Sequence, residues 1–308
     1  MSPISTYPFF LSHLRPIVFF LFFFSCITNS FSQKDLISDS RSNLLSFRGY
    51  FSTLGKNFAQ QAASPFHLQT RGYLTAAALI SSTLIMTTLD GGVNDEFRNL
   101  KSDNRIIHNA GPLVSSLGGT YGIAGVCAFG LAGIIFNNND ITETGLLATQ
   151  AMITSGVWVN VVKILAGRER PFVSYEASGI PGGRWFGPLT QFSNPDNLPH
   201  ASFESFPSGH TTTAFAIATV FAMKYKNCKA IPITAYSIAT LIGASRMTEN
   251  KHWLSDIFVG AALGHLCARQ IMQSHYASVE KGEKKNHSLL FIMPDMSSVP
   301  SAKAVLIF

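Results

Sequence analysis

The stretch PSGHTTT, residues 207 to 213, places a titratable ring where a turn leads into a helix. A helix N-terminus presents unpaired N–H groups and a partial positive charge, and both attract anions. Ser208 is a suitable cap for such a helix, and Gly209 lets the backbone approach a bound group closely. The stretch therefore predicts either an anion site that includes His210 or a plain helix start on which His210 merely lies.

A second concentration of charge ends an apolar run at KILAGRERP, residues 163 to 171. Lys163 and Arg170 are seven residues apart, about two helical turns, so both side chains are expected on one face of a helix. Pro171 is expected to stop that helix. The pair fits two roles, which are gripping an anion and solvating a helix C-terminus, where cations are favoured.

The third stretch, SRMTENKHWLSD, residues 245 to 256, contributes Arg246, His252 and Asp256. The His–Asp spacing of four residues lets the two side chains share a helical face and hydrogen-bond. A carboxylate that accepts one imidazole N–H fixes the tautomer and makes the other ring nitrogen the better nucleophile. Pairs at this spacing are also common as structural features, so both roles stay open.

The connections between the apolar runs are expected to bring the three stretches together. A long loop returns the chain to the end of the bundle where Arg170 lies, and a helical hairpin returns it there again at Arg246. Three cationic side chains, a helix N-terminus and two histidines would then line one pocket. Such a pocket suits a tetrahedral oxyanion.

Six apolar stretches must position these residues. Their lengths and their Ala, Leu and Ile content favour helices over strands. We therefore expect an all-α protein, a helical bundle of about six core helices with the active site at one end. The stretches lie at about 73–89, 111–136, 142–165, 211–225, 230–245 and 254–272.

The composition limits the class of protein. Hydrophobic residues make up 46% and charged residues 13%, about half the roughly 25% usual in globular domains. This balance favours a membrane protein or a compact helical bundle. The net charge of +6 comes without a basic stripe interleaved with aromatics, so no nucleic-acid partner is expected. Cys127, Cys228 and Cys267 are widely spaced and indicate neither a disulfide framework nor a zinc site.

Residues 1–32 are typical of a signal peptide, because the apolar run PIVFFLFFFSCI is followed by small residues at Ser30 and Ser32. An uncleaved anchor is the alternative, and the phenylalanines before Cys26 disfavour a lipoprotein. The chain is expected to be exported, either to the cytoplasmic membrane with its active site facing the periplasm or to the soluble periplasm.

The remaining boundaries follow from the runs. We expect an N-terminal arm with a short amphipathic helix at 33–72, the bundle at 73–275, and a tail at 276–308 that ends in one strand or without structure. The loop 172–206 is longer than a loop that only connects two helices usually is. Its larger side chains would cover the pocket and select substrates, or they would simply pack onto the bundle. These side chains are Arg184, Trp185, Phe186 and Phe192.

The number of membrane spans is left open. The runs 211–225 and 230–245 are shorter than the roughly 18 to 20 residues of a spanning helix. The basic turn KYKNCK, residues 224 to 229, and the basic tail would lie on the cytoplasmic side. Either 73–89 does not cross, which leaves five spans, or no helix crosses and the bundle is periplasmic.

Taken together, Lys-x6-Arg-Pro, Pro-Ser-Gly-His and Ser-Arg-x5-His-x3-Asp resemble the signature of the type 2 phosphatidic acid phosphatase family. That family shares its fold with bacterial acid phosphatases and vanadium haloperoxidases. The resemblance covers about residues 110 to 272. The matching positions are Lys163, Arg170, Pro171, Pro207, Ser208, Gly209, His210, Ser245, Arg246, His252 and Asp256.

The resemblance implies a catalytic role for each of three residues. His252 would attack phosphorus and form a phosphohistidine, Asp256 would orient its ring, and His210 would protonate the leaving oxygen and later activate water. The phosphate-binding residues implied in the same way are Lys163, Arg170, Ser208, Gly209 and Arg246. No metal or cofactor is implied, because the cations supply the neutralising charge.

The resemblance leaves the substrate open. A phosphorylated lipid, as a monoester or a pyrophosphate, is expected from the apolar runs and the export signal, and a broad-specificity periplasmic acid phosphatase would take small phosphomonoesters instead. A vanadium-dependent haloperoxidase would use the same anion-binding residues and is an alternative. A protein that binds a phosphate without turnover is another. His108, His200 and His265 are expected to be structural or surface residues.

Overall fold

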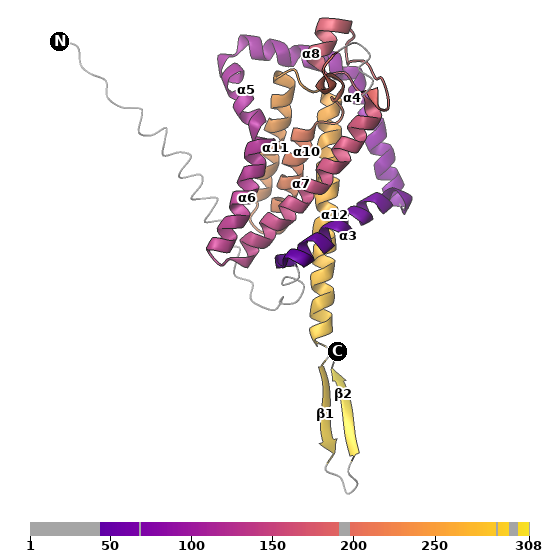
Figure 1. The fold of residues 1–308 in the computed structure, drawn as a ribbon, viewed down its shortest axis with the longest axis vertical. Helices are drawn as coiled ribbons and strands as arrows, with labels where there is room; N and C mark the ends of the chain where they lie inside the picture. Colours follow the sequence, from indigo (N-terminus) through magenta and orange to yellow (C-terminus); the bar gives the residue numbers. More distant parts are fainter. Residues whose placement is uncertain (1–43, 68, 191–197, 288, 296–300, 308) are drawn as a thin grey trace, which may run out of the picture.

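The computed structural model describes residues 44–67, 69–190, 198–287, 289–295 and 301–307. The predicted signal peptide and Phe192 lie outside the described residues. The predicted all-α bundle is confirmed (Figure 1). Its long helices are α3 (Phe47–Ala63), α4 (Thr70–Asp103), α5 (Arg105–Leu117), α6 (Thr120–Ile135), α7 (Asn139–Ala166), α10 (Gly209–Lys224), α11 (Ala230–Thr248) and α12 (Leu254–His287).

Short elements and a hairpin complete the chain. The loop after α7 contains α8 (Pro171–Val173), the π-helical turn η2 (Ser174–Ser178) and the 3-10 turn η3 (His200–Phe203), while η1 (Ser64–Phe66) follows α3. The helix α12 runs to His287, and the tail then forms two antiparallel strands, β1 (Leu289–Asp295) and β2 (Ser301–Ile307). The tail therefore forms a hairpin, where the sequence predicted one strand or none.

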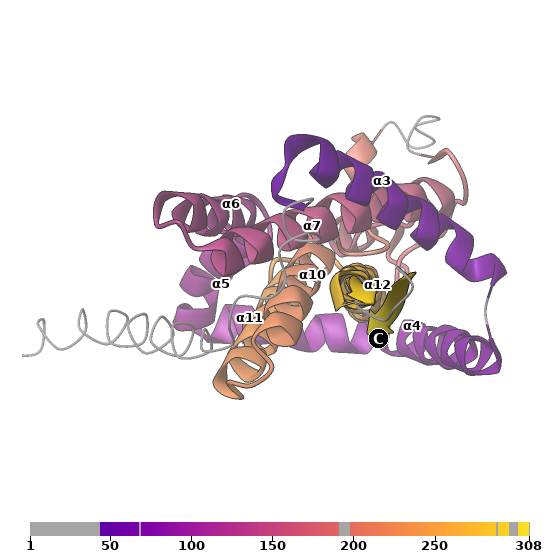
Figure 2. The same ribbon diagram turned by 90° about the horizontal axis from the view of Figure 1, so that it is seen from below.

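The helix α12 lies at the centre of the bundle. Viewed along its axis, it has α10, α7 and α4 around it (Figure 2), and it packs against all three. Leu147, Val220, Ile271 and Met272 form the buried apolar contact among α7, α10 and α12. The backbones of α10 and α12 approach closely, because a Cβ at Gly264 would lie 2.2 Å from the Thr212 carbonyl oxygen. This contact fixes the first turn of α10 against α12.

The first two predicted runs differ in extent from the helices that form there. The run 111–136 forms α5 and α6, which are bent by 48° where Gly118 and Gly119 separate them. The first run extends well past 89, since α4 ends only at Asp103. Within the described residues, α4 and α7 are long and apolar enough to cross a membrane, and the bent pair α5–α6 brings the total to three if it is one span.

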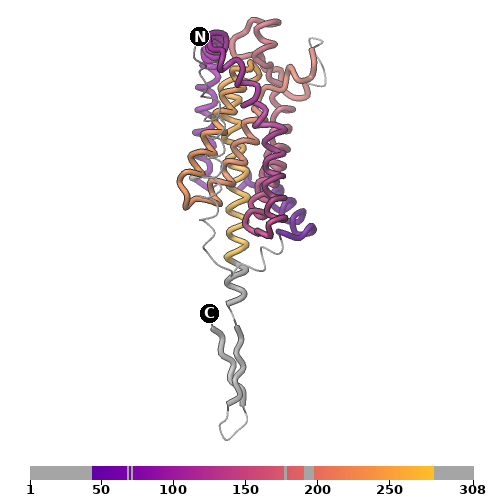
Figure 3. Tube along the Cα trace, turned by 90° about the vertical axis from the view of Figure 1, so that its left-hand side faces the viewer, coloured from indigo at the N-terminus to yellow at the C-terminus, as the bar shows by residue number. Residues whose placement is uncertain are grey.

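The predicted amphipathic helix of the arm is α3, and its polar side chains face the protein. The Asn57 amide donates to Gln150 Oε1 at 3.0 Å, and Trp158 Nε1 donates to Gln61 Oε1 at 3.0 Å. The α3 ring of Phe47 is 83% exposed. Figure 1 shows α3 crossing the bundle obliquely at the end from which α12 projects, and Figure 3 shows α3 at that end from another side.

A buried charge cluster ties α7, α10 and α12 together where α10 ends. Lys224 Nζ lies 3.0 Å from Glu143 Oε2 and 3.6 Å from Asp140 Oδ1. His275 Nε2 contacts the other Glu143 oxygen. Because buried charges are costly unless paired, this cluster fixes the register of the three helices.

The crossing of α6 and α7 depends on two glycines. A Cβ at Gly145 would lie 2.5 Å from Gly130 Cα, whereas a Cβ at Gly156, also in α7, would meet nothing within 4 Å. We expect Gly145→Ala to lower the free energy of unfolding by about 1–3 kcal/mol, because overpacking must push the helices apart. We expect Gly156→Ala to raise it by roughly 0.5–1 kcal/mol through helix propensity. Unfolding in detergent measures both, and equal effects would contradict the close crossing.

Candidate active site

Lys163 and Arg170 are brought to the site by different elements. Lys163 lies in the last turn of α7, which ends at Ala166 because Gly167 adopts the left-handed conformation with φ 53°. Arg170 lies beyond the helix as the N-cap residue of α8. The prediction that both side chains leave one helical face is therefore wrong. The left-handed turn, which favours glycine, redirects the chain before Arg170.

Both cations nevertheless face Glu204, at the end of the long loop. Lys163 Nζ lies 3.9 Å from Glu204 Oε2, and Arg170 Nη2 donates to the Glu204 carbonyl at 3.3 Å. Arg246, in the last turn of α11, donates from Nη1 to Ser115 Oγ of α5. Three cations from three segments thus line one end of the bundle.

Both arginines among these cations have an unused donor. The Nε atoms of Arg170 and Arg246 are buried and have no hydrogen-bond partner among the described residues. Burial lowers the pKa of both side chains, that of Arg246 to about 10, and the charge of Arg170 adds to the effect on Arg246. A buried donor without a partner is costly, so the arrangement favours an acceptor anion at this position.

His210 lies in the first turn of α10 and faces the same cations. Burial and then the charges of Arg246, Lys163 and Arg170 lower its pKa to about 4. The ring packs on the α5–α6 junction, since a Cβ at Gly119 would lie 2.8 Å from His210 Nε2. The ring of His210 therefore lies beside the three cations as well as at a helix start.

Ser208 caps α10, as one of the two sequence interpretations proposed. It is fully buried, and its Oγ accepts from Thr211 Oγ1 at 2.9 Å and from Thr211 N at 3.5 Å. The Ser208 N–H donates to the Asp256 carbonyl at 3.0 Å, which joins the start of α10 to the first turn of α12. The cap and the cationic pocket thus occur together.

His252 is buried, and its ring is held by a backbone carbonyl. Its Nδ1 lies 2.8 Å from the Ser205 carbonyl oxygen, while Asp256 Oδ2 is 3.7 Å away. The expected direct His252–Asp256 hydrogen bond is absent, because α12 begins only at Leu254 and His252 precedes it. With Nδ1–H donated to the carbonyl, Nε2 of the neutral ring carries the lone pair.

Asp256 acts on His252 through Ser205. Ser205 Oγ donates to Asp256 Oδ2 at 2.5 Å, and the Trp253 N–H donates to the same oxygen at 2.8 Å. Arg168 Nη1 donates to Asp256 Oδ1 at 2.6 Å. Burial alone would raise the pKa of Asp256, but Arg168, His252 and Ser205 lower it overall, so the group is a carboxylate at neutral pH.

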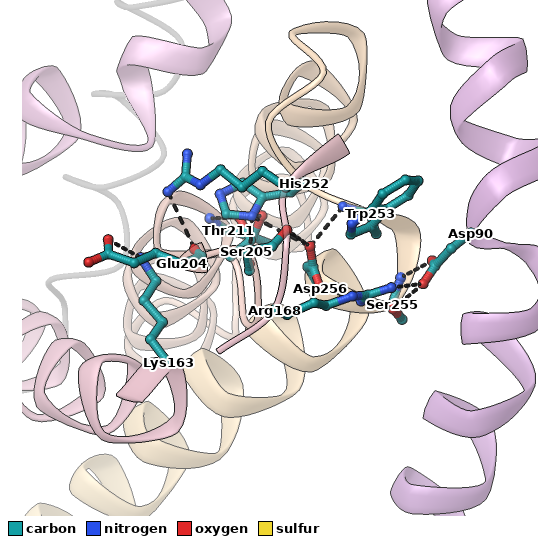
Figure 4. Close-up of polar contacts among 12 residues, drawn as sticks. Asp90, Lys163, Arg168, Glu204, Ser205, Thr211, His252, Trp253, Ser255 and Asp256 are labelled. Carbon is teal, nitrogen blue, oxygen red and sulfur yellow. Dashed lines mark hydrogen bonds and ion pairs between the residues drawn. The ribbon is translucent and has the colours of Figure 1, made fainter. Parts of the chain in front are cut away.

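Four residues that contact the site were not predicted from the sequence. Figure 4 shows their side chains converging on Asp256 or on its partner Arg168. Arg168 stands two residues before Arg170 in the stretch GRERP. The sequence therefore places it near the site, but it does not show which groups its side chain contacts. Asp90 comes from a distant helix and gave no local signal. The four residues are Asp90, Arg168, Ser205 and Ser255.

Three of the predicted loop side chains contact other residues of the segment between α7 and α10. Arg184 Nη2 lies 2.9 Å from Glu169 Oε1, the Phe186 ring packs edge-on against Phe203, and the Trp185 ring covers Arg168 at 4.5 Å. These contacts order the loop, and Trp185 also covers a buried charge of the site network.

The remaining histidines and cysteines lie away from these contacts. His108 and His200 are exposed, and His265 Nδ1 lies 3.1 Å from the hydroxyls of Thr219 and Tyr236 inside the bundle. The three cysteines of the bundle are free. Among the described residues, no group of three or more His, Cys, Asp and Glu side chains is placed to hold a metal ion.

Comparison with known proteins supports the resemblance seen in the sequence. Residues 144–280 match the PAP2 superfamily. A lipid A 1-phosphatase of Porphyromonas gingivalis is 46% identical over 63 residues, which are 20% of this chain and 14% of that protein. A lipid A 1-phosphatase of Rhizobium etli is 31% identical over 124 residues, 40% of this chain and 47% of that protein.

These matches span less than half the length of either phosphatase. The crystal structure of Aquifex aeolicus LpxE aligns with a TM-score of 0.44 at 22% identity, over 60% of this chain and 95% of that one.

The buried imidazole of His252 predicts a loss of stability in acid. Burial is the main cause that lowers its pKa to about 3, below the value of about 6.5 in the unfolded chain. The unfolded state therefore binds the proton more tightly, and stability falls as the pH drops below about 6.5. We expect the thermal midpoint to fall between about pH 7 and pH 4.5, and His252→Gln to flatten this slope.

The exposed His108 provides the control for this measurement. His108→Gln should retain the wild-type slope of thermal midpoint against pH. An unchanged slope in His252→Gln would show that other groups cause the acid sensitivity.

Proposed function

We propose that the protein is a metal-independent phosphatase of phosphorylated lipids, which the match of residues 144–280 to the PAP2 superfamily and the geometry of the site support. It hydrolyses phosphomonoesters or pyrophosphates through a phosphohistidine on His252. The observation that carries the proposal is the pair of buried Nε atoms on Arg170 and Arg246, which find no partner in the described part of the chain and lie beside two neutral histidines. Donors in this arrangement suit the oxygens of a phosphoryl group.

In the proposed first step, Nε2 of His252 attacks phosphorus, and the bond from phosphorus to the leaving oxygen breaks. The attacking ring must be neutral, and its pKa of about 3 keeps it so at neutral pH. The Ser205 carbonyl holds Nδ1–H at 2.8 Å, which orients the opposite nitrogen. The product is a phosphohistidine whose ring carries a positive charge, near the Asp256 carboxylate.

His210 supplies a proton to the leaving oxygen in the same step. Its pKa of about 4 reflects burial and then three neighbouring cations. A bound phosphate dianion offsets those cations, which raises the pKa of His210 and lets it carry the proton. In the second step His210 removes a proton from water, the water attacks phosphorus, the P–N bond breaks, and phosphate leaves.

In this scheme the cationic side chains of the protein stabilise the negative charge of the transferred phosphoryl group. Lys163, Arg170 and Arg246 hold the non-bridging oxygens, and the start of α10 at Ser208 and Gly209 completes the cradle with helix N–H groups. Phosphoryl transfer depends mainly on such positioning and charge neutralisation.

A lipid environment is supported by the distribution of polar and apolar side chains. The core of α7 buries Thr142, Gln150 and Thr154, whereas α4 and α6 leave large apolar side chains such as Leu84 and Ile135 exposed. Apolar exposure over whole helices marks a surface that contacts lipid, and it disfavours the soluble periplasmic alternative. We propose that α4 and α7 span the membrane.

The orientation follows from charge. The basic turn between α10 and α11 exposes Lys226 and Lys229, at the end of these helices opposite His210 and Arg246. Under the positive-inside rule this turn is cytoplasmic, so the site faces the other side of the membrane. Such a placement is consistent with an exported lipid phosphate as substrate.

An apolar groove next to the site suits the hydrocarbon chain of such a lipid. It has a volume of about 370 Å³ and is lined by α5, α6, α10 and α11. Leu117, Phe129, Ile217 and Ile242 contribute its walls. The groove begins beside the catalytic ring, because a Cβ at Gly118 would lie 2.4 Å from Ile242 Cγ2 and 3.1 Å from His210 Cβ.

The central test is phosphate release by the purified protein in detergent with excess chelator. We expect wild type to hydrolyse both a lipid phosphate in micelles and a soluble aryl phosphate, with the lipid preferred. His252→Ala should reduce both rates by at least about 10³-fold, since the covalent step is lost. Vanadate should inhibit.

Each other outcome points elsewhere. Activity that disappears in chelator and returns with a divalent ion would overturn metal independence. Equal rates on both substrates would favour an acid phosphatase of broad specificity. No release from either, with halide oxidation by peroxide after addition of vanadate, would indicate a haloperoxidase.

The groove makes a separate prediction for Gly125, which lines it in α6. A Cβ there would meet nothing within 4 Å, so Gly125→Leu fills the groove without a clash at the first atom. We expect kcat/KM for the lipid to fall about 10-fold or more, with little change for the aryl phosphate. Gly55→Leu on the exposed side of α3 is the control, and equal losses on both substrates would contradict the proposed chain site.

A further inference from the structure

Asp90 of α4 is a buried carboxylate outside the segment that matches the superfamily. It has no exposed surface, and its Oδ2 accepts from Arg168 Nη2 at 2.5 Å. Its Oδ1 accepts from the Ser255 N–H at 2.9 Å, and Ser255 Oγ donates to Oδ2 at 2.6 Å. Figure 4 shows Asp90 reaching from its helix toward Arg168 and Ser255.

Arg168 is shared between two carboxylates. Its Nη2 bonds Asp90, while its Nη1 donates to Asp256 Oδ1 at 2.6 Å and to Ser255 Oγ at 2.7 Å. The Gly182 carbonyl accepts from Nη2 and Nε at 2.6 and 3.3 Å. All three guanidinium nitrogens are therefore bonded, and the fully buried cation has little freedom to move.

The formal charges of the three side chains sum to −1, because two carboxylates enclose one guanidinium. Without Asp90, Arg168 and Asp256 would form a neutral pair, and Arg168 Nη2 would lose its carboxylate partner. Asp256 would then offer less negative charge to Ser205 and to the His252 ring, 3.7 Å away. A negative network beside the ring favours its cationic state, which is the state of a phosphohistidine.

We propose that Asp90 is a positioning residue for the reaction: through Arg168 it fixes Asp256 and Ser205, and it keeps the network beside His252 negatively charged. The proposal rests on the phosphatase function argued above. The helix α4 is thereby part of the active site, although it contributes no group to the reacting atoms.

The contacts of α4 with other site segments agree with this role. Asn94, one turn after Asp90, donates from Nδ2 to Asn250 Oδ1 at 2.9 Å, just before His252. Lys101 of the same helix pairs with Glu249 at 2.9 Å. The helix thus holds both the segment that carries His252 and the first turn of α12.

A purely structural ion pair is the competing explanation, since breaking a buried pair is destabilising in any case. The test therefore needs a readout beyond stability. Asp90→Asn retains one acceptor oxygen for the Ser255 N–H. It removes the charge and places an amide NH2 where Oδ2 accepts from Arg168 Nη2 and Ser255 Oγ. Asp95→Asn is the matched control, an exposed Asp on α4 that accepts from the Tyr175 hydroxyl.

The full-length proteins would be compared in detergent on the soluble aryl phosphate. For Asp90→Asn we expect kcat to fall about 10- to 100-fold, the range typical of partners that orient a reacting group. KM and the Kd for inorganic phosphate should change less than about threefold, because the cradle cations are untouched. The acidic limb of kcat/KM should move to lower pH, since a negative charge near His252 has been removed. Asp95→Asn should match wild type.

If Asp90→Asn does not fold, Asp90→Glu decides the question. This variant keeps the charge and displaces the carboxylate, so the proposal predicts a lower kcat with an unchanged acidic limb. A normal kcat in either folded variant, with only a lower thermal midpoint, would overturn the positioning role and leave a structural ion pair. Failure of the proposed function is distinguishable, because wild type itself would then release no phosphate.

Discussion

The site depends on one buried guanidinium. Arg168 is enclosed by Asp90, Asp256, Ser255 and the Gly182 carbonyl, and Trp185 covers its face. A charge this deeply buried is tolerated only when its donors are all used, which makes its position insensitive to small movements. Helix α4, the loop after α7 and the first turn of α12 are joined through it. The orientation of His252 follows, because Asp256 holds Ser205 and the Ser205 carbonyl holds the ring.

The cationic half of the site, by contrast, is not satisfied by its own side chains. The cradle gathers cations that repel one another and keeps both histidines neutral, mainly by burial. Two of its buried Nε donors have no partner among the residues that the structure describes. One half of the site is satisfied internally, and under the proposed function an anion satisfies the other half. In the proposed reaction this division lets anion binding change the protonation of His210 while His252 stays in place.

The interior of the bundle holds many polar side chains, and its surface holds many large apolar ones. The backbones of α10 and α12 come into contact at Gly264, and polar side chains such as Gln150 and Thr219 bond inside the bundle. Large apolar side chains are left for the outside. This distribution is unfavourable in water and favourable in a bilayer. It also leaves an apolar groove that starts at His210, and in the proposed function this groove places the hydrocarbon chain of the lipid next to its phosphate.

The sequence by itself determined the helical class, the three stretches that meet at one end of the bundle, and the residue types of the cradle. These features depend on hydrophobic periodicity, helix caps and local spacing, which a few consecutive residues specify. It also showed that Ser208 starts a helix.

Tertiary structure alone decided which side chains touch. Gly167 turned Arg170 off the helix of Lys163, and the late start of α12 replaced the expected His252–Asp256 bond with one to the Ser205 carbonyl. The ion pair of Asp90 with Arg168 joins residues 78 positions apart, so no local pattern could reveal it. Contacts of this kind are fixed by how whole helices pack and by the requirement that every buried charge has a partner.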